Sequence, residues 1–65
     1  MMKVEFFKDE TDKQGEINCI SVGTSNCSTI KAGKEAIANR NCDWGMITDG
    51  IEFVGTYTQT GQKLS

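Results

Sequence analysis

Hydrophobic and charged residues alternate at the beginning of the chain, in the stretch MMKVEFFK. Met2, Val4 and Phe6 fall on one face of an extended segment, with charged residues between them, although Phe7 breaks the alternation. Phenylalanine and valine also favour strands. The pattern therefore predicts a first strand over residues 1–8, with one face directed to a core.

A second strand is predicted over residues 16–22, EINCISV, because β-branched residues are frequent there. Its apolar residues change face between Cys19 and Ile20, which leaves two readings: burial on both faces, or a bulge. Residues 9–15 are polar and end in glycine, so they read as a loop, and residues 23–28 are turn formers. We expect the two strands to pair as an antiparallel hairpin with a long, acidic tip.

One helix is predicted, in the segment STIKAGKEAIANRN. Ser28 is the expected N-cap, with Asn26 as the alternative, because a side-chain oxygen there accepts a hydrogen bond from a free backbone N–H. Ile30, Gly33 and Ile37 fall on one face at helical spacing. Glycine lowers helix propensity by about 1 kcal/mol relative to alanine. We therefore expect Gly33 to allow close approach of the helix to a sheet.

The stretch CDWGMITDGIEFVGTY predicts a second hairpin. Asp49 and Gly50, between two runs of strand-forming residues, indicate a two-residue turn of type I′. That turn places on one face the cross-strand pairs Thr48 and Ile51, Met46 and Phe53, Trp44 and Gly55, and Cys42 and Tyr57. We expect the aromatic and apolar side chains of this face to be the core against which the helix packs. Ile47 and Val54 would then form a small exposed patch on the other face.

The predicted elements follow the order strand, strand, helix, strand, strand (ββαββ). Four antiparallel strands with one helix across one face of the sheet form a two-layer α+β sandwich. Residues 1–65 are expected to be a single small domain, with 59–65 as a frayed tail. A chain of this length buries only about 60% of the surface that it exposes when unfolded, so the core must be small.

Composition and charge narrow the class of function. The chain is 37% hydrophobic and 25% charged, as in folded domains, and its net charge of −2 argues against a general nucleic-acid binder. Acidic residues gather in the first hairpin, and basic residues gather on the helix. The predicted partner-binding residues are Asp9, Glu10 and Asp12 at the acidic tip, and Lys31, Lys34 and Arg40 on the helix.

The residues that catalysis and metal binding require are few. The chain has no histidine, which excludes catalytic triads and histidine metal sites. Cys19, Cys27 and Cys42 are fewer than the four ligands of a structural zinc site and show no C-x-x-C spacing. We expect no enzymatic activity, no metal and no cofactor. No signal peptide or membrane-spanning stretch is visible, so we expect a cytoplasmic location in a bacterial host cell, with reduced thiols.

Three hypotheses about function follow. The leading one is a non-enzymatic protein-binding module, an inhibitor or regulator of a host protein or protein complex, for which a homodimer through a sheet edge is a further option. The alternative is a small nucleic-acid-binding regulator that acts through the basic helix face, with an affinity that depends strongly on salt. The third is a structural subunit with no function outside its assembly.

The layout also resembles a known class of proteins. A short hairpin, the single helix STIKAGKEAIANRN, and then WGMITDGIEFVGTY and TQTGQKLS are similar in order and length to small phage and mobile-element proteins. Several anti-CRISPR proteins with a four-stranded sheet and one helix are among them. The resemblance implies a host-directed inhibitor that binds a bacterial protein complex by surface contacts. Such inhibitors often present basic residues to a nucleic-acid-binding groove of the target, and Lys31, Lys34 and Arg40 match that role here.

Overall fold

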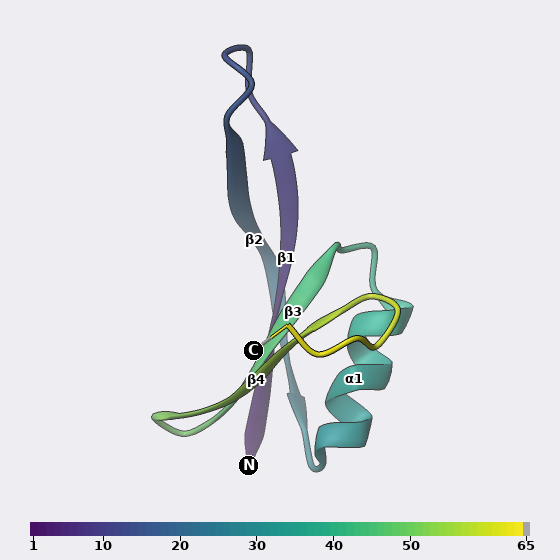
Figure 1. The fold of residues 1–65 in the computed structure, drawn as a ribbon. Coiled ribbons are helices and arrows are strands. Elements are labelled where there is room, and N and C mark those ends of the chain that lie inside the picture. Colours follow the sequence, from purple (N-terminus) through teal and green to yellow (C-terminus); the bar gives the residue numbers. More distant parts are fainter. Residues whose placement is uncertain (65) are drawn as a thin grey trace.

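The computed structural model describes residues 1–64 as a four-stranded antiparallel sheet with one helix on one face (Figure 1). The strand order is β2-β1-β3-β4, so the two central strands come from different hairpins. The elements are β1 (Met2–Thr11), β2 (Ile17–Cys27), α1 (Ile30–Asn39), β3 (Trp44–Asp49) and β4 (Glu52–Thr58). The predicted α+β class, with four antiparallel strands and one helix, is confirmed.

The first hairpin is longer than expected, because both strands continue through residues that read as loop or turn. Residues 23–28 were expected to form a turn, but β2 runs to Cys27. At the tip, Asp12 replaces the long loop with a tight one: its Oδ1 accepts from the backbone N–H groups of Gln14 and Glu16, each at 2.9 Å. Side-chain acceptance of this kind stabilises short turns. Figure 1 shows the far half of this hairpin standing clear of α1.

A bulge interrupts β2, but not at the expected place. Phe6 pairs with Gly23 and Phe7 pairs with Ser21, so Val22 is the additional residue. The other reading, burial on both faces, is wrong, because nearly all of β2 is exposed before Cys27. The change of face between neighbouring apolar residues reflects an outer strand with little core to cover, not a doubly buried one.

Helix α1 begins one residue later than expected. Thr29 is its N-cap, in place of Ser28 or Asn26: Thr29 has an extended backbone, and its Oγ1 accepts from the N–H of Ala32 at 3.0 Å. Gly33 and Ile37 are buried as predicted. Ile30 is 43% exposed and does not join the core, because it lies in the first turn, away from the centre of the sheet.

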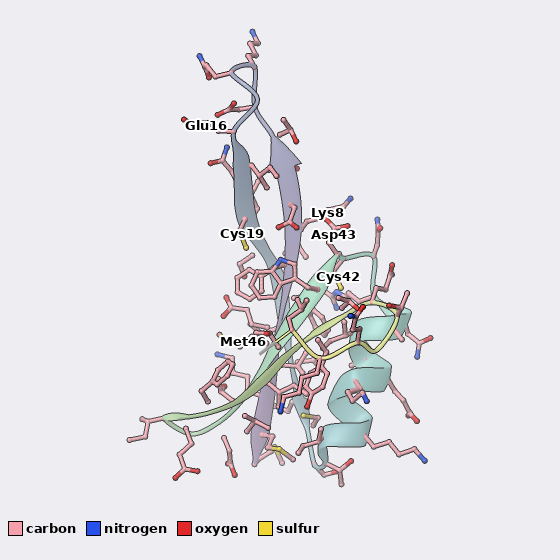
Figure 2. All side chains as sticks on the ribbon, viewed as in Figure 1. Lys8, Glu16, Cys19, Cys42, Asp43 and Met46 are labelled. Atoms are coloured by element: carbon pink, nitrogen blue, oxygen red, sulfur yellow. The ribbon has the colours of Figure 1, made fainter. Side chains whose placement is uncertain are left out.

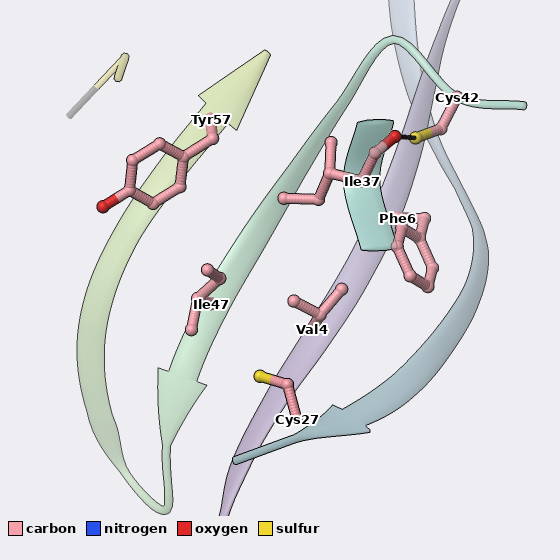
Figure 3. Packing of buried hydrophobic residues seen from close by; sticks show 7 residues of the cluster. All are labelled: Val4, Phe6, Cys27, Ile37, Cys42, Ile47 and Tyr57. Atoms are coloured by element: carbon pink, nitrogen blue, oxygen red, sulfur yellow. Dashed lines mark hydrogen bonds between the residues drawn. The ribbon is translucent and has the colours of Figure 1, made fainter. Parts of the chain in front are cut away.

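The core lies between α1 and the sheet, but the second hairpin presents to it the face opposite to the one expected. The buried hydrophobic residues are Val4, Phe6, Cys27, Ile37, Cys42, Ile47 and Tyr57 (Figure 3). The predicted core positions Trp44 and Met46 are only half-buried, and Phe53 is 55% exposed. Cys42 and Tyr57 are buried as expected.

Glycine explains this exchange of faces. An added β-carbon on Gly45 would lie 2.5 Å from Ile37 Cγ1, so α1 packs directly on the backbone of β3 at this position. The helix could not come this close over Trp44 or Met46. The side chains of β3 that neighbour Gly45 must therefore point to the other face of the sheet.

The turn of the second hairpin is one residue further along than predicted. Asp49 pairs with Glu52, and Gly50 occupies the first turn position with a φ of 64°. Glycine at that position with a positive φ is the arrangement of a type II′ turn. Beyond it, a bulge leaves Val54 as an additional residue that packs against the core. Ile47 is fully buried, so the expected exposed patch of Ile47 and Val54 is wrong.

The segment expected to fray, residues 59–65, turns back along β4 in its described part. The backbone N–H of Thr58 donates to Gln62 O at 2.8 Å, and that of Leu64 donates to Thr56 O at 2.7 Å. Lys63 pairs with Tyr57 as an antiparallel bridge. These contacts give β4 a neighbour on its outer edge.

Candidate protein-binding site

The face of the sheet opposite α1 carries a pair of stacked aromatic rings. Phe7 of β1 and Trp44 of β3 are paired across the two central strands, with ring centroids 4.3 Å apart and planes 14° from parallel. The alternation of side chains along the strands places Met46 and Phe53 on the same face. We call Phe7, Trp44, Met46 and Phe53 the aromatic face. Three of the four are half-buried and Phe53 is exposed, so the face is accessible to solvent.

Carboxylates hold and border this stack. Trp44 Nε1 donates to Asp9 Oδ1 at 3.1 Å, and the backbone N–H of Asp9 donates to Asp43 Oδ2 at 2.7 Å. Glu5 lies on the same face and accepts from Ser21 Oγ at 2.8 Å. The indole is therefore fixed in orientation, with the carboxylates of Asp9 and Glu5 on the face that carries the rings. Asp43 acts through the backbone of Asp9, and the same alternation places the exposed Lys3, opposite Thr48, at the other end of this face.

The three acidic residues predicted to bind a partner do not form one cluster. Asp9 borders the aromatic face. Glu10 follows it in the strand and so points to the opposite face, where it is exposed and paired with Asn18. Asp12 is used by the hairpin tip, where its carboxylate accepts two backbone hydrogen bonds. Only Asp9 is brought into a surface that combines charge with apolar area.

Two of the predicted basic residues share a groove beside the helix. Lys31 and Lys34 line an open groove of about 390 Å³ between α1 and the turn of Thr60 and Gly61. Lys34 Nζ lies 5.2 Å from the centre of the Tyr57 ring, which is a cation–π distance. The groove is shallow, and its cations are partly balanced by Glu35, which also lines it.

Arg40 is separate from these lysines and serves the fold. Its guanidinium lies 4.8 Å over the centre of the Phe6 ring, and its Nη2 donates to Val22 O at 3.4 Å. Arg40 therefore reaches toward β2, whereas Lys34 reaches toward β4, and these strands are opposite edges of the sheet. The three cations do not make one basic surface.

The cysteines occupy different environments. Cys27 and Cys42 are buried, and Cys19 is exposed on the first hairpin (Figure 2). Cys42 Sγ donates to Ile37 O at 3.6 Å (Figure 3), and burial, followed by the charge of Asp43, raises the pKa of this thiol. Loss of hydration, followed by the charges of Asp9 and Glu5, raises the pKa of the Cys19 thiol. Within residues 1–64, no three cysteine or acidic side chains gather into a metal-binding group.

No family model, no curated protein and no solved structure matches the chain. Roles for its residues therefore come from the geometry. Helix α1 has ten residues, and across residues 1–64 no helix is long and apolar enough to cross a membrane.

The sequence pattern does not predict the aromatic stack, because it places Trp44 in the core. One signal in the sequence could have found it: Phe7 breaks the alternation of the first strand, and a large apolar residue out of phase faces away from the core. Phe7 and Trp44 become partners only through the pairing of β1 with β3, which joins residues 37 positions apart.

Proposed function

We propose that this protein is a non-enzymatic protein-binding module and that the aromatic face is its contact surface. The observation that carries the proposal is the Phe7–Trp44 stack, held in place by Asp9 on the sheet face that α1 leaves open. Rigid, partly exposed aromatic side chains are the residues that contribute most to protein interfaces. A ring that is already oriented by a hydrogen bond loses little conformational entropy on binding.

The carboxylates define the chemistry of the partner. Glu5 and Asp9 lie on the face of the stack, whereas Lys3 lies at the far end of the face, so the surface that complements the stack combines an apolar or aromatic group with arginine or lysine side chains. An arginine that lies on the Trp44 ring and reaches a bordering carboxylate would satisfy both features.

The nucleic-acid alternative has a different support. Aromatic rings on an open four-stranded sheet can stack on bases, and Lys31 and Lys34 line one groove. However, the carboxylates on the face of the rings would repel phosphates, and the two lysines belong to α1, which forms the other layer. Protein binding is therefore the better-supported function.

The proposal includes a biological role, inhibition or regulation of a host protein complex by a protein of a phage or mobile element, in the bacterial cytoplasm. This role rests on the resemblance in size and element order. A homodimer through a sheet edge is also part of the proposal.

The test is an affinity pull-down from bacterial lysate, with and without nuclease, followed by mass spectrometry. We expect a stoichiometric protein partner that survives nuclease, is lost with Phe7→Ala and is retained by Lys31→Glu/Lys34→Glu. The lysine variant is a matched control because it changes the other layer. Loss with the lysine variant alone would move the contact to the helix, and loss with nuclease would favour nucleic-acid binding.

A further inference from the structure

Strand β2 forms an edge of the sheet that has little of the usual protection apart from its bulge at Val22. It is eleven residues long and contains no proline and no charged residue. Three of its apolar side chains are exposed: Ile17 by 73%, Ile20 by 40% and Val22 by 38%. Because β1 lies on one side of β2, every second residue directs its N–H and C=O groups to the side without a strand. Proteins normally block such edges with charges, proline or a covering segment.

The opposite edge of the same sheet is protected. There the segment after β4 folds back, with the Lys63–Tyr57 bridge and the hydrogen bond from the Leu64 N–H to Thr56 O at 2.7 Å. Among residues 1–64, one edge is thus covered by the segment after β4, whereas the other has no strand beside it and leaves backbone groups free on the side away from β1, except where Arg40 binds Val22 O. Free backbone groups in a row are satisfied by one kind of ligand, another extended strand.

The far half of β2 is the part best suited to take that strand. At the bulge, Arg40 donates to Val22 O, which occupies the edge at this point. Strand β3 ends its pairing with β1 at Trp44, so beyond it β1 and β2 pair only with each other. A two-stranded hairpin is marginally stable in water, and a third strand would stabilise it. These limits select residues 17–21.

We propose that residues 17–21 of two copies of this chain pair antiparallel about a two-fold axis through Cys19. Ile17 then faces Ser21 of the second copy, Asn18 faces Ile20, and Cys19 faces Cys19. In this symmetric pair, every residue of β2 faces a residue of the β2 strand in the second copy. Because β2 contains no charged residue, no like charges face each other. The two sheets join into one of eight strands. This inference deepens the homodimer named in the proposed function and gives its edge and register.

The test introduces a charged residue of either sign at the two-fold axis. Sedimentation equilibrium of the reduced protein, from low micromolar to near-millimolar concentration, is expected to show a dimer that dissociates on dilution. Cys19→Lys and Cys19→Glu each place like charges face to face and are expected to weaken the dimer at least tenfold. An equimolar mixture of the two variants is expected to form a heterodimer. Cys19 is exposed, so neither change removes a core contact, and circular dichroism is expected to stay native.

Thr11→Lys is the matched control. Thr11 lies on β1 and pairs with Ile17, so this change adds the same charge to the same hairpin but not to the edge formed by β2, and the dimer is expected to persist. A monomeric wild type at all concentrations, or a dimer indifferent to both Cys19 variants, would overturn the inference. So would a mixture that fails to associate. None of these results would decide whether the aromatic face binds a partner. That proposal is tested separately, by the pull-down with Phe7→Ala.

Discussion

Gly45 of β3 lies directly beneath Ile37 of α1, so that a β-carbon on Gly45 would come within 2.6 Å of both Cγ1 and Cδ1 of Ile37. The relationship is repeated in reverse at Gly33 of the helix, where a β-carbon would lie 2.7 Å from Ile47 Cδ1. Each isoleucine fills the space that a glycine on the facing element leaves free. These two contacts set the distance between the layers and decide which face of the second hairpin is buried.

Gly45→Ala is expected to destabilise the fold by about 1–3 kcal/mol, because the added methyl group overpacks a filled core. The Glu5 carbonyl, 3.3 Å from the added carbon, is backbone and limits the relaxation. Urea denaturation gives the change in the free energy of unfolding.

A double-mutant cycle provides the control for Gly45. Ile37→Val removes Cδ1 and opens space above the glycine, so Gly45→Ala is expected to cost less in that background than in the wild type. An equal cost in both backgrounds would show that the methyl group acts through the strand backbone and not through Ile37.

Phe7→Ala is expected to shift Trp44 fluorescence to longer wavelength and to increase its quenching by acrylamide, because the ring that covers one side of the indole is removed. The lost ring–ring contact is expected to lower the free energy of unfolding by about 0.5–1.5 kcal/mol, in addition to the effect of the apolar area that Phe7 buries. Phe53→Ala is the matched control: Phe53 is on the same face but pairs with Thr48, and its removal is expected to leave the emission unchanged. A similar shift in both variants would contradict the pairing of Phe7 with Trp44.

Cys42 is expected to make stability fall at alkaline pH. Burial raises the pKa of its thiol above the ordinary value of 9.0, so the unfolded state loses this proton first as the pH rises. The stability that Cys42 contributes is therefore fully present below pH 9.0, and it is lost as the pH rises through the pKa of this thiol in the folded protein. Relative to pH 7, the free energy of unfolding of Cys42→Ala is expected to fall less than that of the wild type as the pH rises above 9.0. Parallel curves would mean that Cys42 does not contribute.

Arg40→Ala is expected to cost about 1 kcal/mol, because the guanidinium and its stem cover the Phe6 ring and reach Val22 O. Lys31→Ala, an exposed cation on the same helix, is expected to change stability by less than about 0.5 kcal/mol. Thermal or urea denaturation of both variants compares them directly. If neither variant changed the free energy of unfolding measurably, Arg40 would have no role in stability and would be available to bind a partner.

Local sequence patterns predicted much of this fold, because they depend on interactions between residues that are close in the sequence. The alternation of Met2, Val4 and Phe6 predicted the buried face of β1, and the spacing of Gly33 and Ile37 predicted the buried face of α1. The candidate site was harder to predict. Asp9 was identified as a contact residue for its charge, but its role beside Trp44 depends on a contact between residues 35 positions apart.

By itself, the sequence determined the element types, their order and the antiparallel α+β class, because periodicity and turn residues act within a few positions. Only the tertiary structure decided which face of the second hairpin is inside. Trp44, Met46 and Phe53 would bury more apolar area in the core than Gly45 and Ile47 do, so hydrophobicity alone favours the wrong face. The helix can approach the sheet only where a glycine leaves room, and that fit between Gly45 and Ile37 sends the aromatic side chains to the open face.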